Sequence, residues 1–149
     1  MREVSTEEIT KNIKEMCIEA NYTLSDDVKN KIINSAAVEE SEIGKKILNQ
    51  LEENMNIADS DNIPICQDTG MAVIFIKIGQ DVHITGGNLE DAINQGVREG
   101  YIEGYLRKSV VKDPIIRENT KDNTPAVIHY EIIPGDKIEI TVAPRGFGS

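Results

Sequence analysis

The sequence lacks any long apolar run and any secretory leader. No stretch of the 149 residues approaches the roughly 20 apolar residues that a bilayer-spanning helix needs. The first eight residues do not combine a basic segment with an apolar run, as a signal peptide would. We therefore expect a soluble, cytoplasmic protein.

Cysteine is also scarce, because only Cys17 and Cys66 occur. Cys17 belongs to an apolar helical pattern and is most simply a small core residue, whereas Cys66 lies in a polar loop after Pro64. These different surroundings do not suggest a disulfide, and reduced thiols are expected in the cytoplasm. A single loop cysteine often has no function, so Cys66 taken alone assigns none.

Basic residues are too few to balance the acids. The 16 Lys and Arg residues are outnumbered by 26 Asp and Glu residues, which gives a formal charge of −10. Such a charge repels nucleic acid and anionic membranes, so neither is an expected partner. The length allows one self-sufficient core, and we expect a single domain, helical over residues 5–58 and mixed over residues 63–149.

Three helices are predicted in the first third of the chain. Ser5 begins a capping box with Glu8, Ser25 precedes two acidic residues, and Ser41 precedes a third periodic segment. Each segment repeats apolar residues at helical spacing. In the third helix these residues are Ile43, Ile47, Leu51, Met55 and Ala58.

A loop and a strand follow the helices. The polar residues from Asp59 onward and Pro64 end the helical pattern and leave the chain extended. The apolar run 71–78 then predicts a strand that is buried on both faces. Residues 66–70 would lie at the mouth of this central strand.

A fourth helix is predicted from Asn88, whose side chain can cap it. Gly96, Gly100 and Gly104 lie four residues apart on this helix, and each costs roughly 1 kcal/mol relative to alanine. The exposed backbone should therefore be approached closely by another element, which is the simpler explanation, or by a ligand.

The last part of the chain predicts two strands joined by a tight turn. Residues 126–133 form the first strand, and Pro134 with Gly135 suits the turn. Residues 137–142 alternate between polar and apolar, as in a sheet with one wet face. The predicted fold is α+β, with a helical N-terminal part, a mixed or antiparallel sheet, an intervening helix and a C-terminal β-hairpin.

A local basic excess interrupts the acidic chain. It consists of Arg107, Lys108, Lys112, Arg117 and Lys121. A dicarboxylate ligand needs a local positive charge of this kind to bind, although a basic run is usually a solvated face. On the sequence alone, Arg107 is most simply a solvated cation at a helix end.

Several segments together resemble one enzyme family. Pro-Ile-Cys-Gln-Asp-Thr-Gly at 64–70, placed before an apolar strand, resembles the N-terminal signature of class I fumarate hydratases. Further segments are similar in order and spacing, namely 104–111, Asp113-Pro114, Arg117, Asn119-Thr120, 122–129 and the glycine-rich end 143–149. The resemblance covers nearly the whole chain and extends to the α subunits of L-tartrate dehydratases.

The resemblance implies a [4Fe–4S] cluster held by three cysteine thiolates, with one iron left open as a Lewis acid. Cys66 matches the first of these ligands. Gln67 and Asp68 match residues at the substrate, and Asp68 is also the candidate for proton or water handling. Arg107 matches an arginine that grips a substrate carboxylate, and Gly148 would bring a backbone amide close to the anion.

The chain offers only one of those three thiolates, at Cys66. The resemblance implies that the other ligands and the proton-abstracting base belong to a C-terminal domain or a separate β subunit of an oligomeric enzyme. We therefore expect these residues to be a truncated N-terminal part of an α subunit that holds no stable cluster and is inactive alone.

Several functional alternatives stay open at this point. The resemblance implies reversible hydration of fumarate to malate, with dehydration of L-tartrate or mesaconate chemistry as alternatives. A different hypothesis is a non-catalytic module that docks a subunit through the glycines at 96, 100 and 104. A redox-sensing thiol at Cys66 is a third.

Overall fold

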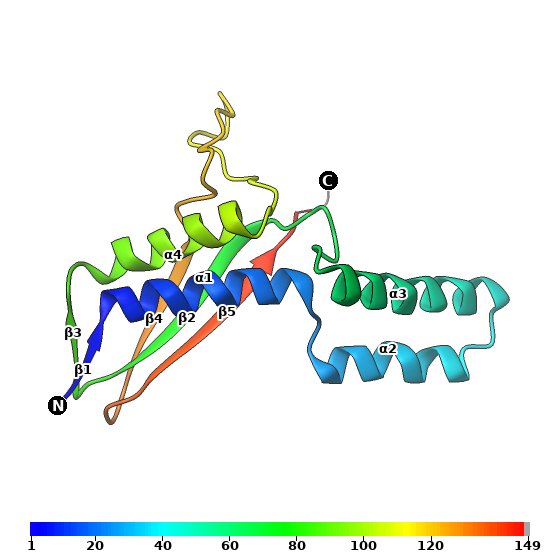
Figure 1. The fold of residues 1–149 in the computed structure, drawn as a ribbon, viewed down its shortest axis with the longest axis horizontal. Helices are drawn as coiled ribbons and strands as arrows, with labels where there is room; N and C mark the ends of the chain where they lie inside the picture. Colours follow the sequence, from blue (N-terminus) through cyan, green and yellow to red (C-terminus); the bar gives the residue numbers. More distant parts are fainter. Residues whose placement is uncertain (148–149) are drawn as a thin grey trace. The chain divides into compact units, whose positions relative to one another are not determined.

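The computed structural model describes residues 1–147, which form two compact units (Figure 1). The first unit combines residues 1–20 with the chain from Gln67 onward, and the second contains Asn21–Cys66. In chain order the elements are β1 (Arg2–Ser5), α1 (Thr6–Tyr22), α2 (Asp26–Val38), α3 (Glu42–Asp61), β2 (Met71–Gly79), β3 (Val82–Thr85), α4 (Leu89–Glu103), β4 (Val127–Ile133) and β5 (Ile138–Arg145). The predicted α+β class is confirmed, because helices precede a mixed sheet.

The helices begin where the cap signals predict. Ser5 Oγ accepts a hydrogen bond from the Glu8 amide at 3.1 Å, and Asn88 Oδ1 accepts from the Glu90 amide at 2.8 Å. Ser25 precedes α2, but its side chain makes no capping hydrogen bond with the helix. Among the described residues, no helix combines the length and apolar composition that a membrane crossing requires.

The second unit contains the antiparallel pair α2 and α3. None of the residues of α2 is buried, and the apolar stripe of α3 is buried only at Met55 and Ala58. At its other end the stripe reaches solvent, where Ile43 is 72% exposed. Helix α3 ends at Asp61, because Asn62 takes a left-handed conformation with φ of 53°.

The first unit is built on β2, the central strand of a sheet with the order β4-β2-β5. Strand β4 pairs with β2 in parallel and β5 pairs with it antiparallel, while β1 and β3 form a separate parallel pair. The predicted tight turn does join β4 to β5. The two strands nevertheless pair with β2 rather than with each other, since the most apolar strand takes the central position.

One face of this sheet is covered and the other is open. Ala72, Ile74 and Ile76 of β2 are fully buried, whereas Phe75 between them is 45% exposed. The prediction that this strand is buried on both faces is therefore wrong, because α1 and α4 lie over one face only (Figure 1). On the open face the rings of Phe75 and His129 stack with their centroids 4.9 Å apart.

Helix α1 packs directly on the glycines of α4. A Cβ atom at Gly96 would lie 2.6 Å from the carbonyl oxygen of Thr10, and one at Gly100 would lie 2.9 Å from the Cβ of Cys17. The predicted close approach is confirmed, and Cys17 is a core residue whose burial raises its pKa to about 12. Since α1 covers these glycines, they do not offer an open surface to a docking partner.

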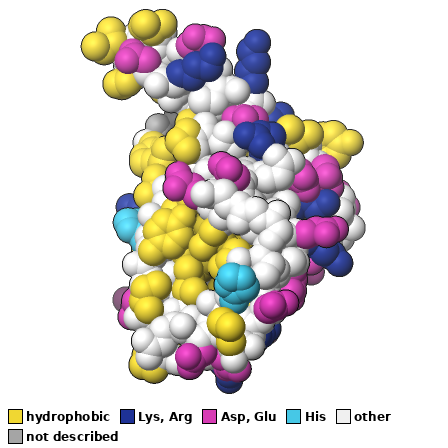
Figure 2. Space-filling view, turned by 90° about the vertical axis from the view of Figure 1, so that its left-hand side faces the viewer, with side chains coloured by type: hydrophobic (Ala, Val, Ile, Leu, Met, Phe, Trp, Pro, Cys, Tyr) yellow, Lys and Arg dark blue, Asp and Glu magenta, His cyan; other side chains and the backbone are white. Residues whose placement is uncertain are grey.

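The segment between α4 and β4 projects from the first unit. Figure 2 shows hydrophobic side chains at the end of this projection, beside Lys and Arg side chains. Ile115 and Ile116 of this segment are 89% and 78% exposed. We call residues 108–121 the projecting loop.

Arg98 of α4 anchors the chain between the projecting loop and β4. Its Nε donates to Asp122 Oδ2 at 2.9 Å, and Asp122 Oδ1 accepts from the amide and hydroxyl of Thr124 at 3.1 and 2.8 Å. Partial burial alone would raise the pKa of the Asp122 carboxyl. The hydrogen bonds outweigh that effect and lower the pKa from 3.8 to about 2.

Asp122→Asn should lower the free energy of unfolding by about 1–2 kcal/mol at neutral pH. A carboxyl with a depressed folded-state pKa stabilises the fold above its unfolded pKa of 3.8, and this stabilisation disappears as the pH falls toward about 2. Urea unfolding of parent and variant at about pH 7, 4 and 2.5 measures the difference. If the free energies of unfolding of parent and variant differ by the same amount at all three pH values, the charge of Asp122 is not the cause of the difference.

Candidate functional site

The predicted site residues are distributed over both compact units. Cys66 is the last residue of the second unit, and the chain from Gln67 onward belongs to the first. The amide of Ile65 donates to the carbonyl oxygen of Asn21 at 2.9 Å, and Asn54 Nδ2 donates to the carbonyl oxygen of Ile65 at 3.0 Å. These bonds fix the backbone just before Cys66, which is exposed and forms no disulfide.

Thr69 connects the start of β2 to the segment that follows α4. This residue is only 3% exposed, and its Oγ1 donates to the carbonyl oxygen of Arg107 at 2.9 Å. The hydroxyl of Tyr101, which is fully buried in α4, donates to the carbonyl oxygen of Thr69 at 2.8 Å. Asp68 and Arg107, far apart in the sequence, are therefore brought to the same place.

Asn123 makes a second connection between these segments and is fully buried. Its Oδ1 accepts from the amides of Ser109 and Val110 at 2.7 and 3.2 Å. Its Nδ2 donates to the carbonyl oxygen of Gly70 at 3.0 Å. One side chain thus joins the backbone after Asp68 to the backbone after Arg107.

The end of β5 approaches the same loop closely. Gly70 has a φ of +59°, and a Cβ atom there would lie 1.9 Å from the carbonyl oxygen of Arg145. A Cβ atom at Gly146 would lie 2.6 Å from Oδ2 of Asp68. Gly70 therefore requires glycine, because a side chain there would collide with the backbone of β5, whereas a side chain at Gly146 would displace the carboxylate of Asp68.

Asp68 and Arg107 line one open pocket of about 350 Å³. Its other lining residues are Lys108, Ser109, Arg117, Asn119 and Phe147. Of the remaining residues predicted for the first unit, Gln67 is exposed and does not line this pocket. Gly148 lies outside the described residues.

The pocket is electropositive. Arg107, Lys108 and Arg117 bring three cations to it, against a single carboxylate. None of these three residues belongs to an ion pair within residues 1–147, whereas Lys112 of the projecting loop pairs with Glu118 at 2.8 Å. In a chain with a formal charge of −10, such a cluster favours a small ligand with more than one negative charge.

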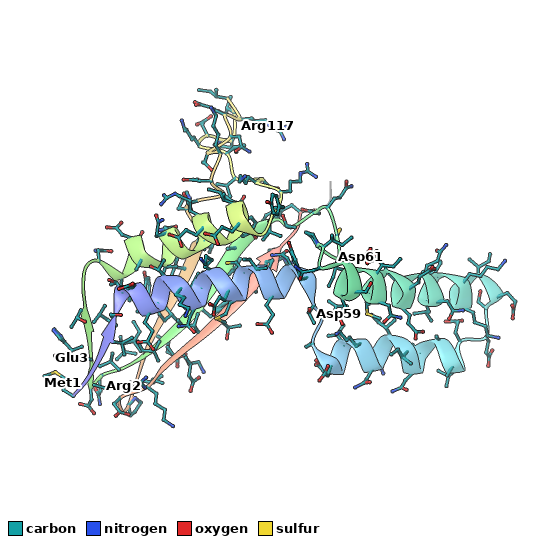
Figure 3. The ribbon with its side chains drawn as sticks, in the orientation of Figure 1. Met1, Arg2, Glu3, Asp59, Asp61 and Arg117 are labelled. Atoms are coloured by element: carbon teal, nitrogen blue, oxygen red, sulfur yellow. The ribbon has the colours of Figure 1, made fainter. Side chains whose placement is uncertain are left out.

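Arg117 belongs to the projecting loop (Figure 3) and is one of the residues that line the pocket. Its φ of 58° lies in the left-handed region, and its amide donates to the carbonyl oxygen of Asp113 at 2.8 Å. The loop is tied at its base, where Asn119 Nδ2 donates to the carbonyl oxygen of Lys108 at 2.8 Å. These bonds hold the loop in a defined conformation beside the pocket.

The sequence reasoning assigned roles to Asp68 and Arg107 but missed Ser109, Asn119 and Asn123. All three lie in segments quoted for the family resemblance, so the available signal was their place in those segments. Polar residues near turns are usually solvated, however, and no local pattern shows which of them will be turned inward.

The described part of the chain contains no complete metal site. Within residues 1–147, no three His, Cys, Asp or Glu side chains lie close enough together to hold a metal ion. The exposed thiol of Cys66 is the ligand type that iron–sulfur clusters take, and its chemistry fits one ligand position. The residues of this chain alone therefore do not fit a whole [4Fe–4S] cluster.

Comparison with known proteins finds matches to one protein family. Residues 10–149 match the family described as fumarate hydratase (Fumerase). The chain is 36% identical over 143 residues to a Methanocaldococcus jannaschii protein that carries the provisional name L(+)-tartrate dehydratase subunit alpha, and this match covers 92% of the chain and 50% of that protein.

Two proteins of Escherichia coli are similar as well. The L(+)-tartrate dehydratase subunit alpha is 35% identical over 141 residues, which cover 88% of this chain and 46% of that protein. The anaerobic class I fumarate hydratase is 39% identical over 113 residues, which cover 74% of this chain and 20% of that protein. The chain thus spans about half the length of these tartrate dehydratase subunits and about a fifth of this fumarate hydratase.

Proposed function

This chain belongs to the fumarate hydratase family, and we propose that it forms the dicarboxylate-binding part of an iron–sulfur hydro-lyase. The observation that carries the proposal is the electropositive pocket shared by Asp68 and Arg107. The proposed role of the 149 residues is that of one domain, the N-terminal part of an α subunit. The complete enzyme would also contain a C-terminal domain or a β subunit and would be an oligomer.

In this proposal Cys66 supplies one thiolate to a [4Fe–4S] cluster whose other ligands come from outside these residues. When bound, the cluster would supply a Lewis acid that polarises the substrate carboxylate and hydroxyl. Support comes from the exposed position of Cys66 directly before Gln67 and Asp68. The thiol of Cys17 is not a candidate, because it is fully buried.

The polar residues of the chain would bind and orient the substrate. The guanidinium of Arg107 can donate two parallel hydrogen bonds to one carboxylate, while Lys108 and Arg117 add positive charge at the same pocket. The carboxylate of Asp68 would hold or move a proton or a water molecule at the substrate. The amide of Gln67 and the backbone of Gly148 would add neutral hydrogen bonds to the anion.

The proposed substrate is fumarate, which the enzyme would hydrate reversibly to malate. Dehydration of L-tartrate is the second candidate, because the two tartrate dehydratase subunits match 92% and 88% of the chain, against 74% for the fumarate hydratase. Both substrates are small dicarboxylates and suit the same cluster of cations. Mesaconate is a further dicarboxylate of this kind, but no observation favours it.

The 149 residues alone should hold no stoichiometric cluster after anaerobic reconstitution with iron and sulfide. They offer one suitably placed thiolate, at Cys66, where a cluster of this type needs three. Ultraviolet–visible absorption and iron analysis measure the outcome, and hydratase assays of the same sample should show no turnover. A stable cluster with about four irons per chain would contradict the proposal.

Two variants of the complete enzyme test the proposed roles. Cys66→Ala should abolish hydratase activity while leaving assembly intact, because it removes a ligand but no core contact. Arg107→Gln should lower kcat/KM by roughly 30-fold to 700-fold, since a charge-assisted carboxylate contact is worth about 2–4 kcal/mol.

The matched control for Arg107→Gln is Lys112→Gln, which removes a cation of the projecting loop that pairs with Glu118 and does not line the pocket. Steady-state kinetics with fumarate and with L-tartrate, under anaerobic conditions, would compare the variants. Full activity of Cys66→Ala would remove the ligand assignment. Equal effects of Arg107→Gln and Lys112→Gln would remove the pocket assignment.

A further inference from the structure

The fully buried side chain of Asn123 bonds to backbone on both sides of the pocket. Its two acceptor bonds, from the amides of Ser109 and Val110, hold the segment that carries Arg107. Its donor bond, to the carbonyl oxygen of Gly70, holds the segment that carries Asp68. The carboxamide is therefore used as an acceptor at one end and as a donor at the other.

The chemistry of this position is demanding. Only a short side chain with both an acceptor and a donor at its end can make these three bonds, which leaves asparagine as the natural choice. Aspartate would keep the acceptor but turn a second oxygen toward the Gly70 carbonyl oxygen. Asn123 also has a φ of 61°, a left-handed conformation that asparagine tolerates better than most residues.

The bonds of Asn123 end next to the residues that form the pocket. Ser109 itself lines the pocket, and Gly70 lies two residues after Asp68. The hydroxyl of Thr69 adds a parallel bond to the carbonyl oxygen of Arg107 at 2.9 Å. Together these bonds fix how far the backbone of Arg107 lies from that of Asp68.

We infer that Asn123 is a positioning residue that sets the spacing between Arg107 and Asp68 for a dicarboxylate, acting through the Ser109 amide and the Gly70 carbonyl. The inference rests on the proposed function of this pocket. Asn123 is fully buried, so it acts on the substrate only through these two segments. Thr69 contributes to the same positioning through its bond to Arg107.

The experiment uses the complete enzyme with Asn123→Asp and, as a second variant, Thr69→Val, which removes only the hydroxyl bond to Arg107. Each should lower kcat/KM for the dicarboxylate by about tenfold to a hundredfold, because small displacements of a substrate-positioning group have effects of that size. The loss should appear mainly as a higher KM, since Arg107 binds the substrate in the ground state as well.

The matched control is Asn94→Asp. Asn94 Oδ1 accepts from the amide of Ala126, which follows Asn123 in the chain, at 2.9 Å, and Asn94 does not line the pocket. Aspartate keeps this acceptor but loses the bond that Asn94 Nδ2 donates to the carbonyl oxygen of Glu90 at 3.0 Å. The variant should therefore lower the melting temperature but leave kcat and KM unchanged well below that temperature. If Asn123→Asp and Thr69→Val behave in the same way, the two residues are merely structural and the inference is overturned.

A double-mutant cycle separates this inference from the proposed function. Asn123→Asp should cost little further kcat/KM in an Arg107→Gln background, because the group it positions is already missing. If the two losses multiply independently, Asn123 does not act through Arg107. If Arg107→Gln alone leaves the kinetics unchanged, the proposed function itself fails. Should Asn123→Asp fail to fold, Thr69→Val in the same cycle decides the question.

Discussion

The buried carboxamide of Asn123 is the contact on which the candidate site depends. Leaving a buried backbone partner of this side chain unpaired would cost about 1–3 kcal/mol, so its bonds to Val110 and Gly70 favour one arrangement of the two segments. Together with the bond from the Thr69 hydroxyl to the Arg107 carbonyl oxygen, they join the segment that carries Asp68 to the segment that carries Arg107. The pocket of Asp68 and Arg107 is a consequence of this connection rather than of sequence proximity.

The packing of the first unit leads directly to this connection. The bare backbone at Gly96 and Gly100 lets α1 approach α4, and both helices cover the buried face of β2. Helix α4 is thereby held where the hydroxyl of Tyr101 reaches Thr69 at the start of β2. The two glycines lower the helix propensity of α4, but the packing of α1 on them fixes the position of the residues before Arg107.

Local signals predicted the elements well, but they could not predict the long-range arrangement. The caps at Ser5 and Asn88 place α1 and α4 correctly, and alternation identifies β5. The same patterns do not say that β2 separates β4 from β5, because strand order depends on competing long-range pairings. The prediction that β2 is buried on both faces was also wrong, because an apolar sequence does not show whether helices cover one face of a strand or both. The position of Asn123 was equally unpredictable, because an asparagine near a turn usually faces solvent.

The central claim is that this pocket binds one carboxylate of a small diacid through Arg107. The most direct measurement is a structure of the complete enzyme with an unreactive dicarboxylate bound. Our account predicts a guanidinium nitrogen of Arg107 at hydrogen-bonding distance, roughly 2.7–3.2 Å, from a carboxylate oxygen of the ligand, with Asp68 beside it. A diacid bound elsewhere, with Arg107 and Asp68 both facing solvent, would contradict the account.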